Sequence, residues 1–193
     1  MLRMMFAVLV SALVAVACSL LPVERPQDFS PTLEWNTGSL PAERPQDFSL
    51  TLEWNTGSLP PQYTYMYVIS LGPGLQGRLE YRPGYDPNDT SRQWVTAFSV
   101  SEQQMKELFF YLQNQDMFRS NWKKGELMMG GSGTSLILNA YGKEFHVPSI
   151  SEVDHTEFAR VDAAIEAIRA LVPQTIWDEM DARQAEYEDH YEE

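Results

Sequence analysis

The chain has 193 residues, enough for one domain with appendages, and its 44% hydrophobic and 21% charged residues indicate a folding chain, which excludes intrinsic disorder throughout. Its formal net charge is −13, and residues 173–193 alone hold eight acids against one arginine, a net −7. A chain of this sign is repelled by phosphate backbones, so the composition argues against nucleic acid as a partner.

Residues 1–17 have the pattern of an export signal. Arg3 supplies a positive charge, and residues 4–17 then form a 14-residue apolar run that only Ser11 interrupts. This run is shorter than the roughly 20 apolar residues that a membrane-spanning helix needs, and it suits the core of a signal peptide. We therefore predict that the chain is exported from the cytoplasm.

The apolar run ends in Ala15-Val16-Ala17-Cys18, which resembles the lipobox of bacterial lipoproteins, with alanine where leucine is usual. The resemblance implies a lipid on Cys18 and a location in the cell envelope, anchored to the extracytoplasmic side of a bacterial membrane. Two acyl chains hold a protein to a bilayer stably. Two alternatives stay open: ordinary signal peptidase cutting the same bond, and an uncleaved anchor that extends to Leu21. Cys18 is the only cysteine, so no disulfide within one chain supports the fold.

Residues 24–42 and 43–61 are two copies of one 19-residue sequence, identical at 17 positions. Solenoids need about three or more units to bury a continuous core, so a recent tandem duplication explains the pair better. The second copy has the alternating pattern of a half-buried strand, carried by Phe48, Leu50, Leu52 and Trp54. We expect this copy to lie in a sheet.

The first copy has Pro31 where the second has Leu50. Proline lacks the amide donor that a central strand needs, so we expect residues 18–46 to form a Pro-rich tether. The first copy is then either a loose spacer or a strand that adds to a sheet edge, in its own molecule or a neighbour's, which would allow self-association through 24–42.

The pattern between residues 47 and 177 predicts an α+β domain, followed by an acidic helix or tail over 178–193. The order of strands, helix, hairpin and helix indicates an antiparallel sheet of about five strands with two or three helices packed on one face. The predicted strands are 47–56, 63–71, 77–83, 134–141 and 144–148, with a short extended piece at 94–100. The predicted helices begin at Glu102, with Ser101 as its cap, and at about residue 152.

Three tyrosines, Tyr63, Tyr65 and Tyr67, alternate along the second predicted strand and are the candidate binding residues. A tyrosine stripe suits a recognition surface, because each ring offers rigid area with a hydrogen-bonding tip. The same stripe suits a sheet face that a helix half covers. Both interpretations stay open.

Several motifs resemble chemical sites but lack the necessary context. Residues 72–77 form a GxGxxG, yet a strand follows instead of the helix that a dinucleotide site requires, so we predict a hairpin loop and no cofactor. His146, His155 and His190 lack metal-ligand spacing. Residues 86–90 resemble the start of a calcium loop without its later glycine and glutamate, which leaves only weak calcium binding open. We predict no metal site.

The absence of a catalytic constellation favours a non-enzymatic extracytoplasmic binding or interaction domain. Its partners would be the bilayer, through Cys18, and another envelope protein or polymer. Two alternatives are a hydrolase of an envelope or extracellular polymer, and a small inhibitor of an exported protease that presents a rigid loop such as 72–77. Leu59-Pro60-Pro61 and Arg82-Pro83-Gly84-Tyr85 resemble an uncharacterised bacterial domain, a resemblance that implies no activity.

Overall fold

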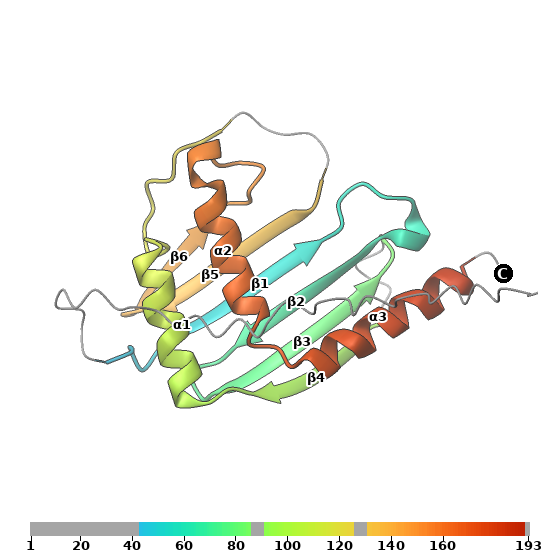
Figure 1. Ribbon diagram of the computed structural model, residues 1–193, viewed down its shortest axis with the longest axis horizontal. Helices are drawn as coiled ribbons and strands as arrows, with labels where there is room; N and C mark the ends of the chain where they lie inside the picture. Colours follow the sequence, from blue (N-terminus) through green and yellow to red (C-terminus); the bar gives the residue numbers. More distant parts are fainter. Residues whose placement is uncertain (1–42, 86–90, 126–130, 192–193) are drawn as a thin grey trace, which may run out of the picture. The chain divides into compact units, whose positions relative to one another are not determined.

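The computed structural model describes residues 43–85, 91–125 and 131–191, which form two layers. One layer is a six-stranded antiparallel sheet with the order β4-β3-β2-β1-β5-β6, and the helices cover one of its faces (Figure 1). The predicted α+β class is therefore confirmed. The sheet has six strands instead of about five, because the extended piece at 94–100 pairs with β3 along its length.

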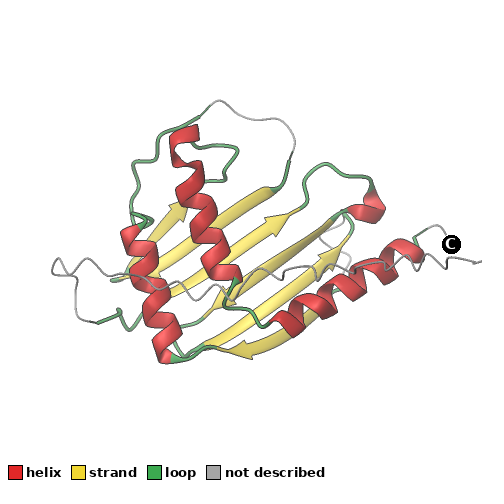
Figure 2. Cartoon of the chain, viewed as in Figure 1, coloured by secondary structure: helices red, strands yellow, loops and turns green. Residues whose placement is uncertain are grey.

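The elements follow the order strands, helix, hairpin and helices (Figure 2). The strands are β1 Ser49–Asn55, β2 Tyr65–Leu71, β3 Gln76–Pro83, β4 Trp94–Ser99, β5 Gly133–Ala140 and β6 Lys143–Val147. The helices are α1 Glu102–Asn114, α2 Phe158–Arg169 and α3 Gln174–Asp189, with short 3-10 helices η1 Pro61–Tyr63 and η2 His155–Glu157. None of the helices within these ranges is long and apolar enough to cross a membrane.

The second copy of the duplication supplies β1, a central strand. Leu50 lies opposite Leu71 of β2 on one side and Leu138 of β5 on the other, and it is 2% exposed. The prediction that this copy enters the sheet is confirmed. The first copy, residues 24–42, lies outside the described residues.

Helix α1 begins as predicted. The Ser101 side chain accepts a hydrogen bond from the Gln104 amide, and the Gln104 side chain accepts one from the Ser101 amide, which together satisfy two amide donors at the helix start. Its buried face, Met105, Leu108, Phe109, Phe110 and Leu112, packs into the core.

Helix α2 begins at Phe158, six residues later than the predicted start near 152. After a turn at residues 151–152, Val153 forms an antiparallel bridge with Lys124: the Gly125 amide donates to the Glu152 carbonyl, and the Asp154 amide donates to the Lys123 carbonyl. Backbone groups engaged in this bridge cannot open a helix, so the chain first forms η2, which Asp154 caps, and α2 follows it.

The folded part extends beyond residues 47–177 at both ends. The boundary at 177 lies within α3, where Met180 and Gln184 are buried, so this acidic helix belongs to the domain. At the other end, the Arg44 guanidinium forms an ion pair with Glu102 of α1 at 3.0 Å, so the fold begins before residue 47.

Candidate ligand-binding site

Four aromatic side chains lie next to one another across β1–β4 on the face that the helices cover. The strand register places Trp54 opposite Tyr67, Tyr67 opposite Tyr81, and Tyr81 opposite Trp94. The Trp54 and Tyr67 rings are stacked, with centroids 5.2 Å apart and 13° between their planes. Aromatic pairs directly opposite each other stabilise a sheet. We call these four residues the aromatic row.

Helix α3 packs on the aromatic row although its own buried face is small. Near its start, Trp177 meets the Tyr67 ring edge-on, with centroids 5.1 Å apart. Two turns later, the Arg183 guanidinium carbon lies 4.8 Å from the centre of the Trp94 ring, a cation–π contact. The row therefore provides a docking surface for a helix that has little apolar surface of its own.

A buried hydrogen-bonded pair fixes the middle of α3. The Tyr81 hydroxyl donates to Gln184 Oε1 at 2.6 Å, and Gln184 Nε2 donates to the Gln62 carbonyl at 2.9 Å and to Glu188 at 2.8 Å. Burial raises the pKa of the Tyr81 phenol, which keeps the hydroxyl protonated and able to donate. Because each polar group has its partner, this pair orients α3 on the sheet.

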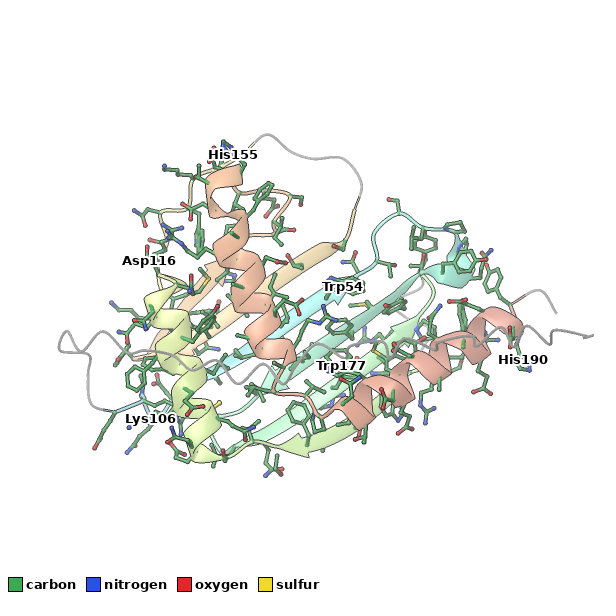
Figure 3. All side chains as sticks on the ribbon, viewed as in Figure 1. Trp54, Lys106, Asp116, His155, Trp177 and His190 are labelled. Carbon is green, nitrogen blue, oxygen red and sulfur yellow. The ribbon has the colours of Figure 1, made fainter. Side chains whose placement is uncertain are left out.

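Beside the second half of α3 is a pocket of about 360 Å³. This volume lies in the range of roughly 300–1,000 Å³ that is usual for sites of small ligands. Tyr81 contributes from β3, Arg92 from the segment before β4, and α3 supplies most of one side; Figure 3 shows His190 at the end of this helix, far from Trp177 at its start. The lining residues are Tyr81, Pro83, Arg92, Arg183, Glu186, Tyr187 and His190.

Two cations reach this pocket from different elements. The Arg92 guanidinium carbon lies 5.0 Å from the centre of the Tyr187 ring, and Arg92 forms no ion pair with any described residue. Arg183 bonds Glu179 through Nη2 at 2.7 Å, which leaves donors on its other nitrogens. Such fixed guanidinium groups against aromatic rings can recognise an anionic group.

One hydrogen bond of His190 defines which of its ring nitrogens carries a hydrogen. Its Nδ1 lies 2.8 Å from the backbone carbonyl oxygen of Glu186. Since a carbonyl can only accept, Nδ1 carries the hydrogen, and Nε2 remains for other partners. Among the described residues that line the pocket, Glu186 is the one carboxylate.

The three candidate tyrosines do not share one environment. Tyr63 lies in η1 and is 47% exposed, whereas Tyr67 is 2% exposed within the core. Tyr65 is half-buried between Trp54 and Tyr81, with ring centroids 5.5 and 5.9 Å away. Tyr67 thus helps to hold α3 and has almost no surface for a ligand.

Cys18 and residues 86–90 lie outside the described residues. The GxGxxG at 72–77 forms the hairpin between β2 and β3, as predicted, with residues 72–75 in the loop and Gln76 and Gly77 at the start of β3. Its last glycine, Gly77, lies so close to Phe98 that an added Cβ would approach the ring to 2.4 Å. This glycine therefore serves packing within the sheet.

The histidines are dispersed in the fold. His146 lies on β6 beside Glu144, His155 in η2, and His190 at the end of α3. Within the described ranges, no three His, Cys, Asp or Glu side chains converge in a way that could hold a metal ion.

The sequence interpretation missed the pocket, although part of it carries a signal. Arg183, Tyr187 and His190 recur at helical spacing on one face of α3, a pattern that could have been read as a polar–aromatic stripe. Arg92 carries no such signal, because only the tertiary structure brings it to α3. No family model matches the chain, and a search of curated proteins finds none with significant sequence similarity.

Proposed function

We propose that this chain is an exported, lipid-anchored protein of the bacterial cell envelope whose domain binds a ligand without transforming it. The observation that supports binding most directly is the pocket beside α3, where Arg92 and Arg183 reach a partly aromatic lining. The lipobox-like sequence that ends at Cys18 supports the location.

The alternative to a binding function is an enzymatic one, the hydrolysis of an envelope polymer. Glycoside hydrolases typically use two carboxyl groups about 5–10 Å apart, and one of the described residues lining this pocket supplies a carboxylate. Protease inhibition has less support, because Leu75 of the 72–77 loop packs against the core and its carbonyl accepts a bond from the Val100 amide. A binding pocket is therefore the function that this geometry favours.

The binding proposal is tested by titrating a panel of neutral, cationic and anionic fragments into the full-length protein in detergent micelles. We expect changes in the amide NMR signals to cluster at Arg92, Arg183 and Tyr187. Tyr187→Ala, which removes one wall of the pocket, should weaken the best fragment about tenfold or more, as expected for the loss of a major aromatic contact. Tyr141→Ala, an exposed tyrosine elsewhere, is the control. Binding that maps away from the pocket would refute the assignment.

The lipid anchor predicts how the protein divides between membrane and soluble fractions. Cys18→Ser removes the thiol that would carry the acyl chains. Cleavage of the signal peptide removes the apolar run of residues 4–17 as a second anchor. We expect the variant to move from the membrane pellet to the soluble fraction after cell fractionation. Retention in the membrane at the parent's level would exclude lipid attachment at Cys18.

For residues 24–42 we propose a spacer between the lipid and the domain, with strand addition between molecules as the alternative. The sheet ends in two edge strands, β4 and β6, and an edge strand can accept a further strand. Deletion of 24–42 is expected to leave the melting temperature and the oligomeric state unchanged. A lower melting temperature, or the loss of a dimer in analytical ultracentrifugation, would instead support strand addition.

A further inference from the structure

Two arginine side chains line the pocket of this acidic protein. Among the described lining residues Arg92 and Arg183 are positive and Glu186 is negative, and the ion pair of Arg183 with Glu179 leaves Arg92 as the lining arginine without a carboxylate partner among the described residues. The chain as a whole carries −13. An arginine without a carboxylate partner favours an anionic ligand, and one such arginine favours a ligand with a single negative charge.

The donor geometry suits a carboxylate. A guanidinium presents its N–H groups in a planar fork that matches the two oxygens of a carboxylate. Arg92 has no carboxylate partner among the described residues, and Arg183 uses only Nη2 for Glu179. Both therefore retain donors for a ligand.

The remaining lining is suited to a flat ring. Tyr187 of α3 contributes a half-buried aromatic ring, and Pro83 at the end of β3 adds apolar surface. Rings of this kind pack in offset or edge-on contact with another ring. The volume of about 360 Å³ is near the lower end of the range for small-molecule sites, so it accommodates one ring with a short substituent.

We infer that the pocket binds a small monoanionic carboxylate that carries a flat ring. Its carboxylate is held by Arg92 and Arg183, and its ring packs against Tyr187 and Pro83. This assignment rests on the proposed binding function and adds the chemical class of the ligand.

The test titrates three matched probes into the full-length protein in detergent micelles: benzoate, its neutral analogue benzamide, and phenyl phosphate. We expect benzoate to shift the amide signals of Arg92 and Tyr187 and to bind at least about tenfold more tightly than benzamide, because only benzoate accepts charge-assisted hydrogen bonds on a carboxylate. Arg92→Gln should lower the affinity for benzoate by a similar factor. Arg92→Lys keeps the positive charge but lacks the planar fork of donors. Its affinity for benzoate should lie between that of the unchanged protein and that of Arg92→Gln.

Lys143→Gln removes one positive charge from an exposed residue at the start of β6 and is the matched control, with no expected effect. Equal affinity for benzoate and benzamide would overturn the assignment of a carboxylate ligand. A tenfold preference for phenyl phosphate would overturn the assignment of a single negative charge. If none of the three probes shifts the pocket signals while other fragments do, the ligand class is wrong and the binding function stands. If no compound of any class reaches the pocket, both fail.

Discussion

Leu50→Pro is expected to unfold most of the protein at room temperature. The substitution removes a leucine side chain that is 2% exposed, and it deletes an amide donor in the middle of a strand paired on both sides. Loss of a buried leucine costs about 2–5 kcal/mol, and an orphaned ladder acceptor about 1–3 kcal/mol more. Domains of this kind are typically stable by only about 5–15 kcal/mol. Circular dichroism of the full-length chain, with urea unfolding, measures the loss.

The duplication supplies two informative comparisons for this variant. Leu50→Ala keeps the amide and should retain a cooperative transition at lower urea, which separates the side chain from the hydrogen bond. The double variant Pro31→Leu/Leu50→Pro moves the leucine to the first copy, which otherwise matches the β1 sequence. We expect it to recover most of the lost stability, since a connection lengthened by 19 residues costs only about 1 kcal/mol of loop entropy. If the double variant is as unstable as Leu50→Pro, the first copy cannot replace β1.

Phe109→Ala should lower the free energy of unfolding by about 3–5 kcal/mol, the usual cost of deleting a buried aromatic ring. Phe109 is fully buried at the centre of α1, with its ring 5.0 Å from that of Phe48 and 5.3 Å from that of Phe118. The site joins α1, the segment before β1 and the chain that follows α1, so little can collapse into the space. Thermal unfolding should show a melting temperature at least about 6 °C lower.

Tyr141→Ala is the control for this effect. Its ring also touches Phe109, at 6.2 Å between centroids, but Tyr141 is 55% exposed. Because little of its surface is buried, the change should stay within about 0.5 kcal/mol. Equal losses for both variants would mean that Phe109 is not a central core residue.

The strands and α1 could be predicted from the sequence because local pattern and tertiary environment agree there. The alternation in residues 48–54 matches the burial of β1, and the capping box at Ser101 marks the start of α1. The predicted start of α2 was wrong because residues 152–154 form backbone hydrogen bonds with residues 123–125, which are distant in the sequence. The local sequence pattern around a helix start cannot reveal a hydrogen-bonded contact with such a distant segment.

The site was less predictable than the fold for the same reason. Tyr63, Tyr65 and Tyr67 were grouped by their spacing alone, yet Tyr63 falls in η1 and α3 covers Tyr67. The weak apolar edge of α3 gave no sign of where it docks, since a cation–π pair and a buried amide add to the contacts of Trp177 and Met180. Arg92 joins the pocket through the packing of α3 on β3 and β4, which no short segment encodes.

The aromatic row gives the protein an internal optical reporter. Three of its five tryptophans, Trp54, Trp94 and Trp177, belong to the row or touch it. If α3 lifts from the sheet, Trp94 loses the guanidinium of Arg183 and Trp177 enters water, so the emission maximum moves to longer wavelength. Steady-state fluorescence can therefore follow the attachment of one helix while the remainder of the domain stays folded.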